Sequence, residues 1–466
     1  MTSAASRLVC AGCEREVPAE RPIIWACPNV AAGDDIDHVL KRVLDPGADV
    51  RADGEVADEP FVRYRRRFHS YQVAIANGWS DARYVATVRE LDEAIAAVDG
   101  AGFRTTPLVR TPALDERRGF SGGGGILVKD ETGNVSGSHK ARHLMGVMLG
   151  LRVAEALGQA DPQAPLAIAS CGNAALAAAV VARAAERRLL VFVPPTAEES
   201  VVARLRELQA EIEVCERAPG QAGDPTVQRL LEAIDEGAVP FTVQGNLNGL
   251  AIEGGQTLAW ELLDQLQGQA LDRLVIHVGG GAFASSASQT LEEAVGSGRL
   301  ASMPVIDTVQ TQGGYPLRRA HLRALEHLRV PEGMPVEQAA VDGAMSQAVH
   351  HRSDYMWAWE TEPVSVAHGI LDDETYDWAA VVRAMLLTGG RSVVVDEATL
   401  EAANALARPV VGIDACYTGT AGLAGLIQLT RDGIVRPDET VAAVSYTHLR
   451  AHETNDLISY SVLVMK

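Results

Sequence analysis

The sequence predicts an α/β fold in which helices cover both faces of parallel β-sheets, preceded by a small extension that carries cysteines. Short apolar runs alternate with longer helical patterns along most of the 466 residues, and this alternation is typical of βαβ units. Polar and glycine-rich motifs follow three of the apolar runs. Because ligands bind beyond the carboxyl ends of parallel strands, we expect these motifs to meet at one edge of the sheets.

The composition indicates a small-molecule ligand. The chain is 47% hydrophobic and 22% charged, with a net charge of −20 and no basic block, which disfavours nucleic acids and anionic membranes as partners. Six cysteines in a chain of this length do not make a disulfide scaffold, and the first residues lack the apolar core of a signal peptide. We therefore expect a cytoplasmic protein in a reducing setting.

Residues 1–45 form the predicted cysteine-bearing extension. Cys10 and Cys13 make a CxxC pair, and Cys27 follows without a second CxxC partner, which is only part of a zinc-ribbon pattern because a structural zinc needs four ligands. His38 and Asp34 are the candidates for the fourth position. We expect a degenerate ribbon packed on the main body, with the three cysteines as vestigial zinc ligands and no firm metal site.

Eight apolar runs are expected to be strands, at residues 126–131, 165–170, 189–195, 211–216, 238–243, 273–281, 305–313 and 392–397. Residues 173–188, 198–210 and 254–266 have helical patterns. The uncharged run at 166–182 approaches the length of a membrane span. It carries SCGN at its centre, which indicates a turn between a strand and a helix, so we reject a membrane span.

Lys140 stands at the start of the helical pattern that follows the first of these strands. The residues after it, LMGVMLGL at 144–151, are apolar on all sides, which favours a buried helix over a solvated lysine at a helix start. Burial removes the hydration of an ammonium group, which costs free energy, so a buried lysine indicates a specific role for that side chain. A lysine with a lowered pKa can attack a carbonyl and form a Schiff base.

Two further motifs lie at predicted strand ends. VGGGAF at 278–283 opens a helix, and consecutive glycines there let backbone N–H groups bind a phosphate. SCGNAA at 170–175 places a hydroxyl, N–H groups and a carboxamide at a helix start, where a carboxylate is favoured. The alternative for Asn173 is a plain helix cap. SGGGG at 121–125 precedes a strand and predicts only a flexible turn.

A lysine for an aldehyde, a glycine turn for a phosphate and an asparagine for a ring substituent match the needs of pyridoxal 5′-phosphate (PLP). In order and spacing the chain resembles the fold-type II PLP-dependent enzymes, the superfamily of threonine synthase, threonine and serine ammonia-lyases, cysteine synthase and the tryptophan synthase β-chain. Its layout is most similar to threonine synthase-like members. The landmarks within residues 104–444 are TTPLVRTPAL (105–114), KDETGNVSGSHKAR (129–142), ASCGNAALAAAVVARA (169–184), IEGGQTLAWELLDQL (252–266), VGGGAFASSA (278–287) and YTGTAGLAGL (417–426).

This resemblance implies the fold and the site residues. The fold would be that of the tryptophan synthase β-chain, two open, twisted, parallel-rich sheets flanked by helices, in a homodimer. Lys140 would be the catalytic residue and hold PLP as a Schiff base. The other cofactor-binding residues would be His139, Asn173 at the ring hydroxyl, Gly279, Gly280, Gly281 and Ala282 at the phosphate, and Thr418 at the pyridine nitrogen. Ser170, Cys171 and Gly172 would bind the substrate carboxylate.

The predicted activity is that of a PLP-dependent lyase of amino-acid metabolism. It would eliminate a substituent from a hydroxy- or phospho-substituted L-amino acid, with or without replacement, as threonine synthase or a threonine/serine ammonia-lyase does. A neutral Thr418 hydroxyl beside the ring nitrogen suits elimination better than transamination. His139 is similar to the tryptophan synthase β-chain and Arg142 to the ammonia-lyases, so the substrate stays open.

Two alternatives to this activity remain. One is a β-replacement synthase of the cysteine or tryptophan synthase kind, and the other is a non-catalytic PLP-binding protein. A nicotinamide enzyme is excluded, because no GxGxxG follows a strand with an acidic residue about twenty positions on.

The predicted catalytic domain covers residues 46–444, with a smaller lobe at about 145–250. Residues 350–378 are rich in histidine and aromatic side chains and are expected to pack between the lobes, or alternatively to select the substrate or contact a subunit. From residue 445 the α/β pattern breaks, and SYTHLRAHET resembles translated sequencing-adapter read-through. Residues 445–466 are therefore predicted to be a non-native tail.

Overall fold

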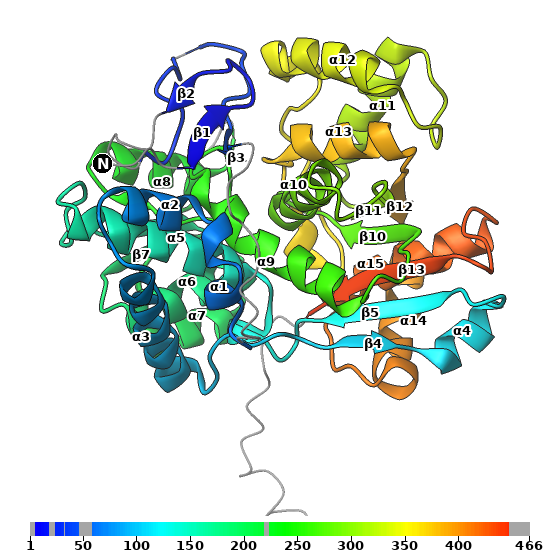
Figure 1. Cartoon of the computed structure of the whole chain (residues 1–466), viewed down its shortest axis with the longest axis horizontal. Coiled ribbons are helices and arrows are strands. Elements are labelled where there is room, and N and C mark those ends of the chain that lie inside the picture. The colour runs from blue at the N-terminus through cyan, green and yellow to red at the C-terminus, as the bar shows by residue number, and fades with distance from the viewer. Residues whose placement is uncertain (1–4, 18–23, 32, 46–57, 219–222, 447–466) are drawn as a thin grey trace, which may run out of the picture.

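Two parallel-rich sheets organise the chain, each in its own half of the molecule (Figure 1). The computed structural model describes residues 5–17, 24–31, 33–45, 58–218 and 223–446. The larger sheet has the order β12-β11-β10-β13-β5-β4. Its parallel strands are Ser392–Val395 (β12), Val305–Thr311 (β11), Arg273–His277 (β10), Thr440–Ser445 (β13) and Gly125–Asp130 (β5), and Leu108–Arg110 (β4) pairs antiparallel at the edge.

Helices cover both faces of the larger sheet, which is why its strands are apolar on both sides. Leu274 and Ile276 of β10 face one core and Val275 faces the other. The first core is completed by Leu250–Gln265 (α9), Ala282–Gly296 (α10), Pro316–Leu328 (α11), Gln338–His350 (α12) and Trp378–Thr388 (α13). The second is completed by Pro112–Arg118 (α4), Glu397–Leu406 (α14) and Tyr417–Arg431 (α15).

The smaller sheet has the order β8-β7-β6-β9 and is parallel. Its strands are Glu211–Val214 (β8), Leu189–Val193 (β7), Leu166–Ala169 (β6) and Val239–Pro240 (β9). The helices of this half are Pro60–Arg63 (α1), His69–Ala76 (α2), Asp81–Asp99 (α3), Lys140–Ala156 (α5), Asn173–Ala184 (α6), Glu199–Glu207 (α7) and Pro225–Asp235 (α8). None of the helices in the described ranges has both the length and the apolar character that a membrane crossing requires.

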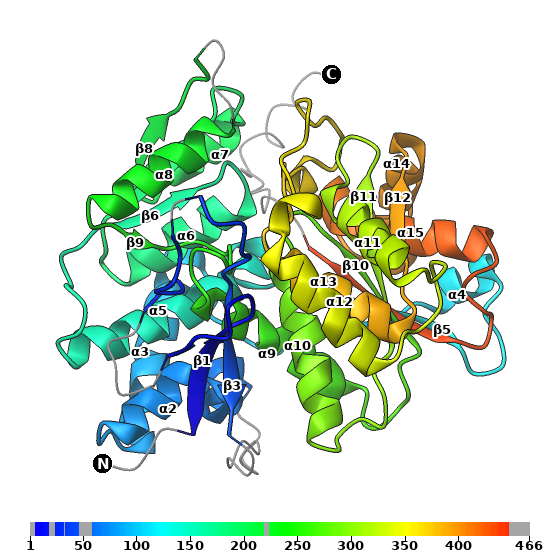
Figure 2. The same ribbon diagram turned by 90° about the horizontal axis from the view of Figure 1, so that it is seen from above.

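A small antiparallel sheet forms the N-terminal unit, with the order β2-β1-β3. Its strands are Ser6–Cys10 (β1), Glu16–Val17 (β2) and Leu40–Leu44 (β3). The unit lies beside both halves, as Figure 2 shows from above. Trp25 accepts a backbone hydrogen bond from Gly249 at the start of α9, and Val349 of α12 accepts one from Asp37.

The predicted α/β class is confirmed, and each of the eight expected strands is present. The run at 238–243 gives only a two-residue strand, because Pro240 has no N–H to donate to the ladder. β13 includes Ser445, and Tyr446 is 2% exposed, so the fold reaches two residues into the predicted tail. Residues 447–466 of that tail, and residues 46–57 at the start of the predicted catalytic domain, lie outside the described residues.

Candidate active site

Lys140 is the first residue of α5, where the chain leaves a tight turn. Ser136 and Gly137 in that turn have left-handed φ angles of 54° and 73°, which let the chain reverse direction between β5 and α5. The helix start is then held by buried ion pairs. The Arg142 guanidinium lies 2.8 Å from a Glu131 carboxylate oxygen and 2.7 Å from one of Glu261 in α9.

The same ion-pair network explains a second buried lysine. Lys129 of β5 donates hydrogen bonds to Glu261 at 2.8 Å and to the Thr106 carbonyl at 2.6 Å. Its side chain is 0% exposed, so this ammonium group has its partners within the protein. Lys140 differs, because the charged groups that act on it are the carboxylates of Asp372 and Asp377, and loss of hydration lowers its pKa despite them.

The glycine motif joins β10 to α10. Gly281 has a φ of 92°, which favours glycine, and a Cβ at Gly279 would lie 2.3 Å from a carboxylate oxygen of Asp372. A Cβ at Gly280 would lie 3.7 Å from the same oxygen, and the Gly280 backbone N–H acts to lower the pKa of Asp372. Thr375 donates to the Gly279 carbonyl at 2.9 Å. The turn therefore lies directly beside an anionic group, and the sequence predicts that this turn binds a phosphate.

Asp372 connects the predicted site residues. Its carboxylate interacts electrostatically with Lys140, Cys171 and Tyr446, in addition to the contact with Gly280. Loss of hydration raises the pKa of Asp372 to about 6, although Lys140 acts to lower it. Sequence reasoning missed both Asp372 and Asp377. The available signal was the acidic run DDETYD inside the unassigned segment 350–378.

The turn before α6 faces the same region. Ser170 Oγ accepts a hydrogen bond of 3.3 Å from the Gly172 N–H, and Asn173 begins the helix. Asn173 is buried, and its Oδ1 has no hydrogen-bond partner among the described residues. Loss of hydration, and secondly Asp372, raises the pKa of the Cys171 thiol. The SCGN turn thus offers a free amide oxygen and helix N–H groups toward Asp372.

Two buried histidines and a tyrosine form a cluster of rings close to Lys140 in the fold. The ring centroid of His139 lies 4.9 Å from that of Tyr446, which in turn lies 4.9 Å from that of His277. Burial lowers the pKa of His277 to about 3 and also lowers the pKa of His139, so both rings are uncharged at neutral pH. Lys140 acts to lower the pKa of both histidines further, so these neutral rings belong to the electrostatic surroundings of the lysine.

Thr418 lies in the first turn of α15 and is buried. Its hydroxyl oxygen accepts a hydrogen bond of 3.1 Å from the Gly369 N–H, three residues before Asp372. A Cβ at the next residue, Gly419, would lie 1.6 Å from the Tyr446 carbonyl oxygen, so glycine is required for α15 to approach Tyr446. Thr418 therefore lies on the same side of the candidate site as Tyr446.

Comparison with known proteins decides the family. Residues 101–446 match the family described as pyridoxal-phosphate dependent enzymes, and this range is most of the chain. The chain belongs to the pyridoxal-phosphate dependent enzyme family. The predicted cofactor, PLP, and the prediction that the protein is an enzyme are confirmed.

Individual PLP-dependent enzymes are similar to the chain over most of its length. A threonine synthase from Methanosarcina acetivorans is 24% identical over 367 residues, covering 74% of each chain. The solved structure of maize serine racemase gives a TM-score of 0.56 at 16% identity, covering 80% of this chain and 95% of that one. A tomato threonine deaminase gives 0.54 at 15% identity, covering 84% and 95%. The two structures support the predicted fold-type II architecture.

The side chains and backbone groups around Asp372 fit PLP. The glycine turn lies against the Asp372 carboxylate, the Asn173 amide oxygen is buried and unpaired among the described residues, and Lys140 is a poorly hydrated amine that interacts with the same carboxylate. A phosphate, a ring hydroxyl and an aldehyde are the PLP groups that such residues would hold.

Segment 350–378 and the cysteines of the N-terminal unit, which the sequence also singles out, have surroundings of their own. In segment 350–378, Tyr355 is buried and stacks on Trp378, while Trp357 and Trp359 contact the Arg319 guanidinium, so its aromatic side chains pack onto α11 and α13. A hollow of about 600 Å³ beside this segment is lined by Arg323, Glu326, His327, Ser353, Asp354, Tyr355 and Trp357, and no predicted site residue lines it. The predicted vestigial zinc ligands form a separate cluster in the N-terminal unit.

Proposed function

We propose that this PLP-dependent enzyme is a lyase that acts by elimination, with or without replacement, on an L-amino acid carrying a hydroxyl or phosphate group, of the threonine synthase or threonine/serine ammonia-lyase type. One observation carries the proposal: the Asp372 carboxylate lies against the glycine turn and also interacts electrostatically with the Lys140 amine. An amine that can capture an aldehyde and a turn that can capture a phosphate thus lie around one small volume.

Lys140 would act both as the attachment point and as the general base. Its lowered pKa increases the fraction of neutral amine near neutral pH, and a neutral amine is required both to attack an aldehyde and to accept a proton from the substrate α-carbon. When bound, PLP supplies an electron sink for the pair left by that proton. The β-substituent then departs with its bonding electrons.

The remaining residues would orient the substrate and the ring. Ser170, Cys171 and Gly172 lie at the N-terminus of α6, where the helix dipole and N–H groups favour a carboxylate. Asn173 would form a hydrogen bond with the ring hydroxyl through its buried side-chain amide. Thr418 would bring a neutral hydroxyl to the ring nitrogen, without the negative charge that keeps such a nitrogen protonated, and the His139 ring is uncharged. A ring whose nitrogen has a neutral partner is a weaker electron sink. It therefore favours elimination, in which a leaving group quickly removes the negative charge, over transamination, in which the ring must hold that charge for longer.

The relatives agree with an elimination step. The Methanosarcina acetivorans relative is a threonine synthase and the tomato structure is a threonine deaminase. A β-replacement synthase would use the same first half of the reaction and differ only in the nucleophile that follows. Assays with and without an added thiol or indole separate these two outcomes.

Borohydride reduction and peptide mapping test the attachment. The chain has only four lysines, Lys41, Lys129, Lys140 and Lys466, so the labelled residue is unambiguous. We expect the label on Lys140 and its loss in Lys140→Ala, with Lys41→Ala as the matched control that keeps it. Label on another lysine, or none on Lys140, contradicts the proposal.

Turnover is tested with a panel of serine, threonine, homoserine and their O-phosphorylated analogues, by following the release of ammonia, keto acid and phosphate. We expect ammonia and keto acid from an ammonia-lyase, or phosphate and a new amino acid from a threonine synthase, and neither in Lys140→Ala. A protein that is labelled on Lys140 but turns over none of the panel, with or without a thiol or indole, would be the non-catalytic PLP-binding protein.

We also propose a homodimer in the cytoplasm. The homodimer rests on the fold-type II resemblance, and the compartment rests on six cysteines that are all free thiols in the structure. Light scattering after gel filtration tests the first, because a mass near 49.5 kDa would indicate a monomer. Fractionation of the source cells tests the second.

A further inference from the structure

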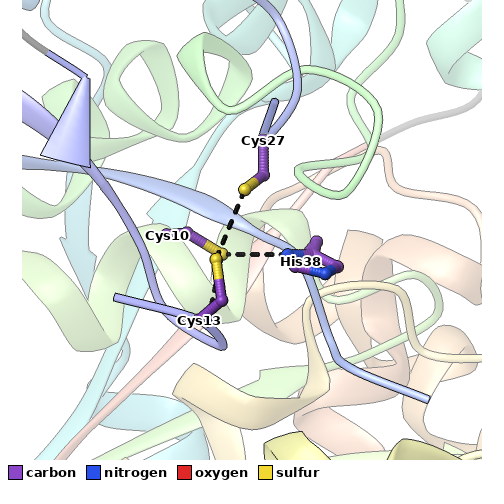
Figure 3. A group of neighbouring side chains, drawn as sticks. All are labelled: Cys10, Cys13, Cys27 and His38. Carbon is purple, nitrogen blue, oxygen red and sulfur yellow. Dashed lines mark hydrogen bonds between the residues drawn. The ribbon is translucent and has the colours of Figure 1, made fainter. Parts of the chain in front are cut away.

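A second cluster of reactive side chains lies in the N-terminal unit, apart from the candidate active site. Cys10 ends β1, Cys13 lies in the turn after it, Cys27 lies in the following loop and His38 precedes β3 (Figure 3). One ligand atom from each of the four lies within 4.8 Å of all the others. Cys10, Cys27 and His38 are buried. All three thiols are free, so no disulfide explains why they converge.

The distances match the edges of a zinc tetrahedron. With Zn–S bonds of about 2.3 Å and Zn–N bonds of about 2.0–2.1 Å, tetrahedral geometry separates two sulfurs by about 3.8 Å and a sulfur from a nitrogen by about 3.6 Å. The Cys13 and Cys27 sulfurs are 3.6 Å apart, and the Cys10 sulfur is 3.4 Å from His38 Nδ1. An ion at the centre therefore requires only small side-chain shifts.

The groups around the four side chains are those that orient metal ligands. His38 turns Nδ1 toward Cys10 and Nε2 toward Asp34, whose carboxylate oxygen lies 3.3 Å away. A carboxylate behind a ligating histidine fixes its tautomer and direction. The N–H groups of Cys13 and Asn29 donate to the sulfurs of Cys10 and Cys27, each at 3.4 Å, and such bonds stabilise a thiolate.

We propose that Cys10, Cys13, Cys27 and His38 bind one structural zinc ion. The sequence left the fourth ligand open between His38 and Asp34, and the geometry assigns it to His38, with Asp34 behind it. Four protein ligands fill the tetrahedron, and three thiolates with one imidazole are the donor set of a closed structural zinc site. Glycine is required at position 12, because a Cβ there would lie 2.4 Å from the Asp37 carbonyl oxygen, so the CxxC turn and the His38 segment are built in contact.

The proposed ion would also fix the N-terminal unit on segment 350–378. Asp37, next to the ligand His38, lies 3.3 Å from the Arg352 guanidinium, and its N–H donates to the Val349 carbonyl. Asp35 accepts two hydrogen bonds from Ser353, at 2.8 and 2.9 Å. The metal site therefore holds the start of the segment that ends with Asp372 and Asp377 at the candidate active site.

Metal analysis of the purified full chain tests this proposal. We expect inductively coupled plasma mass spectrometry to find one zinc ion per chain in the wild-type protein. Most of this zinc should be lost in Cys13→Ser and in His38→Ala. Cys215→Ser, whose thiol lies outside the cluster, is the control and should retain all of it. The proposal would be overturned if wild-type protein, expressed with added zinc, contained less than about a tenth of a zinc ion per chain. Equal zinc contents in the wild type and in Cys13→Ser would also overturn it.

A measurement on the unmodified protein covers the case in which a variant fails to fold. Native protein is treated with iodoacetamide before and after a strong chelator, and the alkylated cysteines are mapped. The expected result is that Cys13, the most accessible of the three, becomes alkylated only after chelation. Equal labelling of Cys13 in both samples contradicts a bound metal. The result is independent of borohydride labelling at Lys140, so the two proposals stand or fall separately.

Discussion

At the scale of single residues, the acidic side chains near Lys140 are the main unexpected feature. The Asp372 carboxylate lies against the turn that is predicted to bind a phosphate. A carboxylate and a phosphate at one turn repel each other and compete for the same space. Asp372 must therefore leave the turn or take up a proton when the cofactor phosphate enters.

The variant Asp372→Asn tests this competition through cofactor affinity. Without the negative charge, we expect PLP to bind about tenfold more tightly at pH 8, equivalent to about 1.4 kcal/mol. Because the pKa of Asp372 is raised to about 6, wild type and variant should converge at pH 5, where Asp372 is largely protonated. Fluorescence titration of the apoprotein measures both affinities. Asp373→Asn, at the adjacent residue, is the control, and equal wild-type and Asp372→Asn affinities at pH 8 would refute the competition.

Asp377 allows a prediction about stability. Burial raises its pKa from 3.8 to about 7, so the folded state holds this proton up to a higher pH than the unfolded state does. The folded state consequently loses stability as the pH rises from about 4 to about 7, by at most about 4 kcal/mol. Asp377→Asn removes this loss, and its Oδ1 can still accept from the Gly245 N–H.

We therefore expect thermal unfolding to show Asp377→Asn more stable than wild type at pH 8, with the advantage disappearing at pH 4. Asp396→Asn is the control, and we expect the opposite effect on stability. Hydrogen bonds from Thr399 lower the pKa of Asp396, so ionised Asp396 stabilises the folded state above pH 4 and its replacement should destabilise the protein there. A constant difference between Asp377→Asn and wild type at all pH values would refute the titration of Asp377.

At the scale of elements, the contact between α5 and α9 positions Lys140. A Cβ at Gly254 of α9 would lie 2.1 Å from the Arg142 carbonyl oxygen, and one at Gly146 of α5 would lie 2.9 Å from the Gly254 Cα. The two helix backbones approach this closely only because both positions are glycine. Arg142 lies two residues after Lys140, so any separation of the helices moves the active-site lysine.

Gly254→Ala should therefore weaken both folding and cofactor attachment. Overpacking at a rigid backbone contact costs about 1–3 kcal/mol, which outweighs the helix-propensity gain of about 1 kcal/mol from alanine. Denaturant unfolding and borohydride labelling of Lys140 measure the two effects. Gly343→Ala is the matched control, because a Cβ at this position of α12 would have nothing within 4 Å, and it should be neutral or stabilising. A stabilised Gly254→Ala would show that the helices can separate freely.

The elements that the sequence predicts are those whose evidence is local. The apolar runs of β5, β6, β7, β10, β11 and β12 and the motifs at their ends are continuous in the chain. Asp372 and Asp377 could not be found in this way, because they reach Lys140 only through a fold that brings together positions more than 200 residues apart. Two strands also lacked a clear sequence pattern of their own. β4 has only three residues, and β13 leads into Tyr446 at the start of the segment where the α/β pattern breaks.

At the scale of the whole molecule, the candidate site joins the two halves. Lys140 and Asn173 belong to the half with the smaller sheet, while the glycine turn, Asp372 and Thr418 belong to the half with the larger sheet (Figure 1). α9 is a physical link between them, since Leu250 and Ala251 pack in one core and Leu258 and Leu262 in the other. A ligand bound by both halves adds a second link and should stabilise their arrangement.

This arrangement predicts how cofactor analogues change thermal stability. At 100 times its dissociation constant, a ligand that binds only the folded state adds about 2.7 kcal/mol to the free energy of unfolding. PLP should produce a shift of this order, whereas 4′-deoxypyridoxine phosphate, which has the phosphate but no aldehyde, should give a smaller shift at equal concentration because it cannot bond to Lys140. In Lys140→Ala the two ligands should become equivalent, since only the phosphate turn and the ring contacts remain. Pyridoxal without phosphate is the control for the glycine turn in the other half. If it stabilised the protein as much as PLP does, the turn would contribute nothing, and the cofactor would not bridge the two halves.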